Sequence, residues 1–226
     1  MTTPAAARGN VAAHVPDRDS ALPDALLRTG ARLGVAGVAV QTVAHLVGVA
    51  LGRTIGQLDL DAGGTVWSWA SSSVTAVGAA ALVAGGVVSR RWWRPAFVLA
   101  PCVAFLSADD AVQIHERLRF ASLGLHEGFR LVWPGVYLPL LAVTFVSGWR
   151  LAPSAGTATA RRAIRRGLGV LAFAIACELA STWLVEDVGA ILEEGAELLG
   201  WTLVASGLAA GVVEIAADHG RTRSLR

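Results

Sequence analysis

The chain has 226 residues, of which 54% are apolar and only 16% are charged. Soluble domains are about 45–50% apolar and about 25% charged, so this composition favours a helical membrane protein. The formal net charge of +2 is too small to favour nucleic acid as a partner. The motifs of serine hydrolases, P-loop enzymes, zinc proteases and CxxC redox proteins do not occur in the sequence.

The first segment, 1–28, mixes Pro, Ala, Arg and Asp. It has no apolar stretch followed by a cleavage site, so we expect a flexible cytoplasmic tail and not a signal peptide. Six later segments hold the ~20 mostly apolar residues that a membrane-spanning helix needs. They are 31–52, 64–88, 95–112, 129–149, 167–185 and 188–213.

These segments predict an all-α polytopic membrane protein, a bundle of about six transmembrane helices in one domain, 29–217. Residues 218–226 are expected to form a second cytoplasmic tail. The fifth and sixth segments are joined by a very short turn at Glu186 and Asp187, which predicts an antiparallel hairpin. Cys102 and Cys177 lie inside apolar stretches, where a free cysteine packs as a small hydrophobic residue.

The arginines predict the orientation, because cytoplasmic loops of membrane proteins are enriched in basic residues. All 19 basic residues are arginines. If the N-terminus is cytoplasmic, 15 of them fall on that side, and only Arg53, Arg117, Arg119 and Arg130 fall on the other. We therefore expect a multi-pass protein of the plasma (inner) membrane of a bacterium, with both termini in the cytoplasm and the lipid bilayer as its surroundings. The sequence carries no signal of the oligomeric state.

The acidic residues show the opposite bias, since 11 of the 17 fall in the outer half of the predicted bundle. The positive-inside rule does not explain this, because acids contribute little to topology. Asp109 lies 14 residues after Pro95, about 21 Å along a helix axis and so still inside a hydrocarbon core of about 30 Å. Glu116 shares the face of Asp109, because seven residues complete almost two turns, and His115 lies beside that face.

A second acidic cluster, Glu193, Glu194 and Glu197, lies in the sixth segment, with Glu197 ten residues into it. Glu197 shares a helix face with either of the other two. Like charges at this spacing repel, and in apolar surroundings they need protonation, a cation or arginine partners. His45, in the outer half of the first segment, could reach the same layer.

Intramembrane ionisable groups usually face the bundle interior, so we expect these side chains to converge beneath the outer surface. The ExxE at Glu194 and Glu197 is similar to the carboxylate-bridged metal sites of helix bundles, although their ExxH element is missing here. The alternative for the first cluster is a helix end that emerges into water with ordinary surface charges. The alternative for the second is an outer helix end that pairs with Arg117, Arg119 or Arg130. The candidate catalytic residues are Asp109, His115, Glu116, Glu194 and Glu197, and the candidate ligands of a divalent metal ion are Glu193, Glu194, Glu197, His115 and His45.

Two stretches, LSADDAVQIHERL (106–118) and LEEGAELLG (192–200), resemble a pattern in uncharacterised bacterial multi-pass membrane proteins. In that pattern Leu-Asp-Glu and His-Glu end one span, and a Glu-Glu-x-x-Glu span follows later. Asp110 stands where the pattern has Glu. The resemblance implies a multi-pass membrane protein and carries no reaction with it.

Three functions use these parts. The leading hypothesis is a membrane-embedded enzyme that acts near the extracytoplasmic face on a lipid or isoprenoid-like apolar substrate, with carboxylates as acid/base groups or as ligands of a cation. The second is a small proton- or cation-coupled transporter that uses the same carboxylates as a relay. Because transporters usually place their site at the midplane between repeats, and the acids here lie off-centre, it ranks second. The third is a structural accessory subunit.

Overall fold

The computed structural model describes residues 18–52, 58, 60, 65–114, 132–180 and 185–224. In these ranges the long elements are all α-helices, which confirms the predicted all-α class for this part of the chain. They are α1 (Arg18–Ala50), α2 (Val66–Val88), α3 (Trp93–Val112), α5 (Val132–Leu151), α6 (Ala158–Leu179) and α7 (Glu186–Ser224), with a short 3-10 helix, η3 (Ala152–Ser154), before α6.

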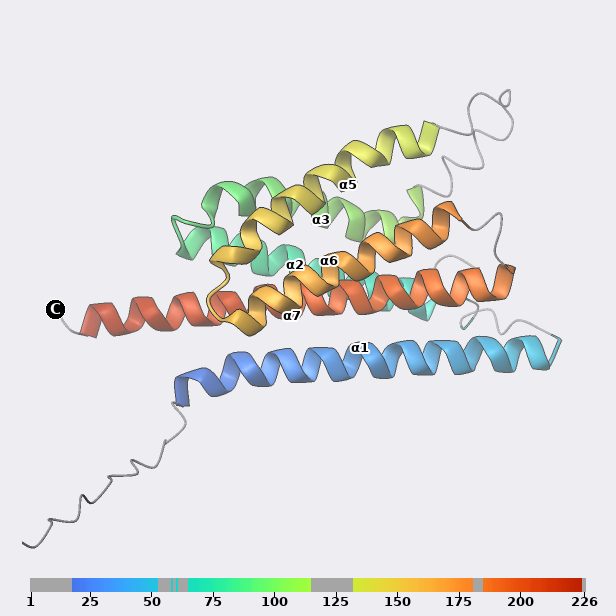
Figure 1. Ribbon diagram of the computed structural model, residues 1–226, viewed down its shortest axis with the longest axis horizontal. Coiled ribbons are helices and arrows are strands. Elements are labelled where there is room, and N and C mark those ends of the chain that lie inside the picture. Colours follow the sequence, from blue (N-terminus) through green and yellow to red (C-terminus); the bar gives the residue numbers. More distant parts are fainter. Residues whose placement is uncertain are drawn as a thin grey trace, which may run out of the picture.

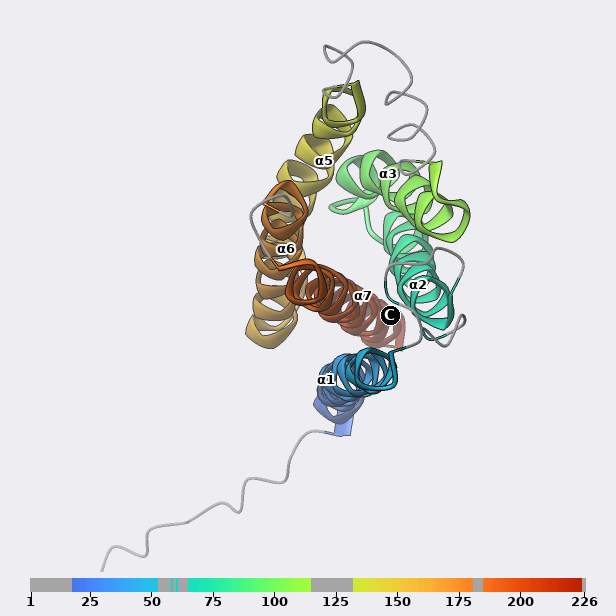
Figure 2. The same ribbon diagram turned by 90° about the vertical axis from the view of Figure 1, so that its right-hand side faces the viewer.

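The longest helix, α7, is the centre of the bundle. It packs against α1, α2 and α6 over much of its length, while α3 packs on α2, and α5 joins α3 to α6. Figure 2 looks along the helices and shows α7 surrounded by these neighbours, with α1 on the outside. The antiparallel packing of α6 and α7 confirms the predicted hairpin, although Glu186 and Asp187 belong to the first turn of α7 and not to a connecting turn.

The two ends of the bundle carry different elements (Figure 1). The α2–α3 turn, the η3 connection and the C-terminus lie together at one end, which we call the Trp92 end. The end of α1 and the start of α7 lie together at the other, which we call the His45 end. By the orientation predicted above, the Trp92 end would be cytoplasmic.

Four of the described helices, α1, α2, α3 and α7, are long and apolar enough to cross a membrane. An integral membrane protein is therefore compatible with the described helices. The four arginines near the start of α6 keep that helix out of this group, since the uncharged stretch after Arg166 is shorter than the ~20 residues of a full span.

Several helices extend beyond the predicted spans. The helix α1 begins at Arg18, inside the predicted tail 1–28, and α7 continues to Ser224, inside the predicted tail 218–226. The helix α6 begins at Ala158, ahead of the predicted start at Gly167. Hydropathy detects the apolar part of a helix, but the hydrogen-bonded backbone continues into polar sequence until a breaker or a cap ends it. At α3 this end was predicted correctly, since the helix ends at Val112 and Gln113 takes the left-handed cap conformation with φ of 55°.

The close packing of α6 on α7 depends on two facing glycines. A Cβ atom on Gly167 would lie 2.7 Å from the Gly200 carbonyl oxygen, and a Cβ atom on Gly200 would lie 2.7 Å from the Leu171 side chain. No other residue leaves room for backbones this close, which is the usual role of small residues between membrane helices. The sequence therefore brings α6 against the same stretch of α7 that follows its acidic cluster.

Trp92 fixes the opposite end of the bundle. Its side chain is fully buried, and it fills a cradle in which Gly85 of α2 and Gly211 of α7 face its ring. The Trp92 Nε1 group donates a hydrogen bond of 3.0 Å to the carbonyl oxygen of Ser154. The α2–α3 turn, the η3 connection and α7 are thus joined at Trp92, so distances along α3 and α7 can be measured from this residue.

Candidate functional site

The most buried candidate residue is Asp109, near the end of α3. Its side chain is 4% exposed, and its Oδ1 atom accepts a hydrogen bond of 2.7 Å from the Tyr137 hydroxyl of α5. The Tyr137 ring also packs near Phe105, one turn earlier on α3, with 6.1 Å between ring centroids. A carboxylate in apolar surroundings is strongly destabilised unless a donor or a cation compensates it, and Tyr137 is such a donor.

The backbone beside Asp109 is held by two serines. Ser72 Oγ of α2 donates to the Ser107 carbonyl oxygen at 2.8 Å, and Ser107 Oγ donates to the Ser72 carbonyl oxygen at 2.8 Å. These reciprocal bonds join α2 to α3 two residues before Asp109. Ser72 thus takes part in helix packing, as small polar residues between membrane helices commonly do. Asp109 therefore stands on a fixed stretch of helix, as a precisely positioned acid/base group requires.

A second polar pair lies at the His45 end. His45 of α1 is 7% exposed, and its Nε2 atom lies 3.1 Å from Oδ1 of Asp187, in the first turn of α7. The Asp187 side chain is about half exposed, so this pair extends from the α1–α7 contact to the molecular surface. His45 is thus mainly an interhelical hydrogen-bonding residue. Its predicted role as a metal ligand stays a prediction.

Gln41 lies one turn before His45 in the same contact. It is 2% exposed, and its Oε1 atom is buried with no hydrogen-bond partner among the described residues. Gly37 of α1 faces Leu198 of α7, while His45 faces Asp187, so the register places Gln41 opposite the α7 turn near residues 191–194. A buried amide oxygen without a donor is unfavourable by about 1–3 kcal/mol, and it stands next to the acidic cluster.

The acidic cluster of α7, Glu193, Glu194 and Glu197, is partly buried along the helix. Its distance along the helix axis from the Trp92 end can be compared with that of Asp109. Glu197 precedes Gly211 by 14 residues, about 21 Å at 1.5 Å per residue, and Asp109 follows Trp92 by 17 residues, about 26 Å. Both clusters therefore lie in the half of the bundle toward the His45 end, at similar levels.

Asp109 and the acidic cluster lie on α3 and α7, two helices whose backbones do not pack closely against each other. The helix α3 packs on α2 and α5, whereas α7 packs on α1, α2 and α6. The predicted approach of Asp109 to Glu194 or Glu197 stays a prediction. His115 and Glu116 lie outside the described residues. Within the described part of the chain, no group of three His, Cys, Asp or Glu side chains is placed to hold a metal ion. A metal site that combines Glu193, Glu194 or Glu197 with His115 stays a prediction, because His115 is not among the described residues.

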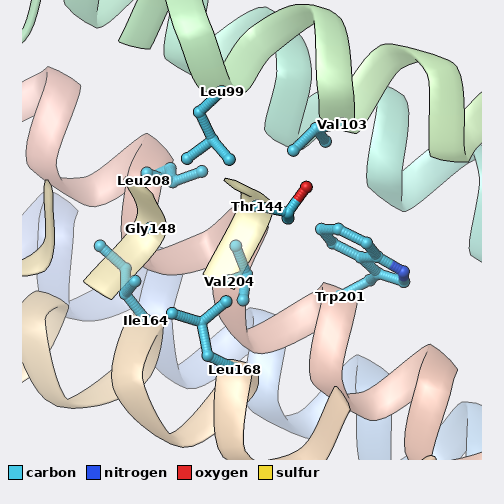
Figure 3. A pocket seen from close by; sticks show the side chains of 9 residues that line it. All are labelled: Leu99, Val103, Thr144, Gly148, Ile164, Leu168, Trp201, Val204 and Leu208. Carbon is cyan, nitrogen blue, oxygen red and sulfur yellow. The ribbon is translucent and has the colours of Figure 1, made fainter. Parts of the chain in front are cut away.

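The side chains of α3 and α7 face each other across a small pocket on the Trp92 side of the acids (Figure 3). Leu99 and Val103 of α3 lie opposite Trp201 and Leu208 of α7, with Thr144 of α5 between them. The Thr144 hydroxyl donates to its own helix, to the Leu140 carbonyl oxygen at 2.9 Å. The cavity volume of about 10 Å³ matches one water-sized sphere. This pocket is part of the core and is too small for a lipid.

Tyr137 is the residue of the candidate site that the sequence reasoning missed. It is the only tyrosine of the chain, and it lies in a predicted apolar span on the side where the acids gather. A single phenol inside a span is a recognisable signal, because its hydroxyl needs a hydrogen-bond partner when it is buried. Its partner could not be named without the packing of α5 on α3.

The comparisons with known proteins identify a family and no function. A family model described as a domain of unknown function, DUF8692, matches residues 30–211 of the chain. The match runs from Gly30, where α1 packs against Ser206 of α7, to Gly211 of the Trp92 cradle. It thus covers the packed bundle and every candidate residue above. No curated protein and no solved structure matches the chain.

Proposed function

The chain belongs to the DUF8692 family, and we propose that this member is a multi-pass enzyme of a bacterial plasma membrane. It would act near the extracytoplasmic face on a lipid or isoprenoid-like substrate. Asp109 would serve as the acid/base group, Tyr137 would hold it, and Glu194 and Glu197 would supply a second acid or hold a cation. His115 and Glu116 remain candidates from the sequence.

The observation that carries this proposal is the hydrogen bond between Tyr137 and Asp109 inside the bundle. Ionisable residues among membrane helices are unfavourable and are usually retained for function. A carboxyl group that is buried, oriented by a phenol and anchored through Ser107 has the parts of a positioned general acid or base. Packing alone would be better served by an apolar residue.

Two further features support an enzyme over a proton- or cation-coupled transporter. The carboxylates lie toward one end of the bundle, about 21–26 Å from the Trp92 end, where a lipid headgroup or a polar end of an apolar substrate would approach. The His45–Asp187 pair extends from the interior to the surface at the same end, which would connect the site to water.

The test compares lipids in cells. A host that lacks the gene receives the wild-type chain, Asp109→Asn, or the control Asp218→Asn, which changes an exposed aspartate near the Trp92 end. We expect one lipid species to change on deletion, and to be restored by the wild type and by Asp218→Asn but not by Asp109→Asn. Membrane levels of all three proteins are measured alongside by immunoblotting.

Two results would contradict the enzyme. Asp109→Asn could restore the lipid profile at equal protein level, which would remove Asp109 from the reaction. Alternatively, vesicles containing the purified protein could show proton flux that Asp109→Asn abolishes while lipids stay unchanged in cells. That second result would favour the transporter.

A further inference from the structure

The Trp92 end carries a dense basic surface. Eight arginines lie on the α2–α3 turn, in the first turn of α3, at the end of α5 and in the first turns of α6: Arg90, Arg91, Arg94, Arg150, Arg161, Arg162, Arg165 and Arg166. The hydrogen bond from Trp92 to Ser154 joins the α2–α3 turn to the connection before α6, so these arginines lie at the same end of the bundle. We call this set the arginine rim.

The described carboxylates do not neutralise this rim. Among the residues that the structure describes, none of the eight arginines forms an ion pair with an acidic side chain. Glu214 of α7 lies at the start of α6, where its Oε2 atom accepts a hydrogen bond of 2.6 Å from the Thr157 backbone, while its buried Oε1 atom has no hydrogen-bond partner among the described residues. The chain as a whole has a formal charge of only +2, whereas the eight arginines of the rim concentrate positive charge at one end of the bundle.

Two arginines of the rim are stacked on exposed tryptophans. The Arg94 guanidinium lies 5.2 Å from the centroid of Trp93, and the Arg165 guanidinium lies 5.0 Å from the centroid of Trp149. Trp93 and Trp149 are about half exposed. A guanidinium that stacks on an indole face keeps its N–H edge available, and this planar edge fits the oxygen atoms of a phosphate.

Each stacked pair continues into an exposed apolar surface. Phe97 lies one turn beyond Trp93 on α3, and Val146 lies one turn from Trp149 on α5; both are about half exposed. Phosphate-binding edges with apolar surface beside them match a lipid, whose anionic headgroup adjoins its acyl chains. A soluble nucleotide or an acidic peptide would leave the apolar surface unused.

We propose that the arginine rim binds anionic phospholipid headgroups, with one headgroup site at Arg94 over Trp93 and another at Arg165 over Trp149. This inference rests on membrane insertion, which is part of the proposed function, but it does not depend on Asp109. Tryptophan at the membrane interface and basic residues on the cytoplasmic side are both suited to such contacts.

The experiment measures the binding of phosphatidylglycerol and phosphatidylcholine to the purified full chain in detergent by native mass spectrometry and thermal unfolding. The wild type should bind phosphatidylglycerol preferentially and unfold at a higher temperature with it. Each basic residue at a membrane surface contributes about fivefold in affinity, so Arg94→Gln with Arg165→Gln should weaken binding about fivefold at each of the two headgroup sites. The matched control is Arg28→Gln with Arg32→Gln, two exposed arginines of α1 without a stacked tryptophan.

Further arms separate the outcomes. Arg94→Lys with Arg165→Lys keeps the charge and should retain part of the preference, which also shows that the fold tolerates change at these positions. Equal weakening in the α1 control, or equal stabilisation by inorganic phosphate or by a soluble polyanion, would overturn the headgroup sites. Failure of the chain to float with vesicles would refute membrane insertion and with it the proposed function. Loss of the lipid preference in a chain that inserts would refute this inference alone.

Discussion

Tyr137 donates a hydrogen bond of 2.7 Å to Asp109, so the only tyrosine of the chain holds a carboxylate that is 4% exposed. The two residues are 28 positions apart on helices that contact each other. Substitutions at this bond can test stability and function separately, because each partner can be replaced by a residue of similar shape.

Tyr137→Phe removes the donor and leaves the buried carboxyl group in place. We expect the free energy of unfolding to fall by about 0.5–1.5 kcal/mol, the usual net contribution of one intramolecular hydrogen bond. Tyr137→Phe with Asp109→Leu removes both partners and should be closer to the wild type in stability, though inactive. Denaturant unfolding in micelles measures both variants. A single variant as stable as the wild type would mean that the bond contributes nothing.

Gln41→Leu should raise stability. The Gln41 Oε1 atom is buried without a described donor, and leucine fills a similar volume with no polar atom. The expected gain is about 1 kcal/mol, measured as an increase in the unfolding temperature. Gln41→Glu, which places a charge at the same position, is the opposing control and should destabilise. A decrease with leucine would show that the amide makes a needed contact, with water or with a ligand.

Gly167→Ala should destabilise the α6–α7 packing, and Gly169→Ala should not. A Cβ atom at Gly167 would lie 2.7 Å from the Gly200 carbonyl oxygen, whereas nothing lies within 4 Å of a Cβ atom at Gly169. Overpacking is unfavourable by about 1–3 kcal/mol, while alanine in an open helical position is favourable by up to about 1 kcal/mol. The two variants are compared by thermal unfolding. Equal effects would contradict the close contact of the two helices.

Glu197→Gln tests the acidic cluster of α7. We expect the variant to insert and fold, with stability unchanged or higher, because like charges four positions apart repel. It should also fail to restore the lipid change of the deleted host, as residues selected for function are often unfavourable for stability. Full restoration would assign Glu197 to an ordinary helix surface.

The predicted orientation can be tested at described positions. In a chain with both native cysteines replaced, Leu51→Cys at the end of α1 should react with an impermeant maleimide added outside intact cells. Gly220→Cys, on α7 at the Trp92 end, should react only after the membrane is opened. Both positions are exposed, so access depends on the side of the membrane. The reverse pattern would invert the orientation predicted by the arginines.

The interactions within the site were beyond the reach of the sequence. The depth of Asp109 in the bilayer was inferred from helix rise and stays a prediction, whereas its 4% exposure shows that it is buried between helices. The partner of Asp109 did not follow, because Tyr137 reaches it from α5 across a long connection. The pairing of His45 with Asp187 was also not predicted, since nothing local in α1 specifies which turn of α7 it faces.

The sequence by itself determined the all-helical class of the described part of the chain, because long apolar blocks in lipid can satisfy their backbone only as helices. It did not determine the number of spans, since six were predicted and four of the described helices are long and apolar enough to cross a membrane. Tertiary structure decided which helices touch. Small residues such as Gly167 and Gly200 allow close approach, but many glycines could serve that purpose, and only the packed bundle selects the pair. The partners of the buried polar groups depend on that selection, because a hydrogen bond requires positions within about 3 Å and the register of two helices sets them.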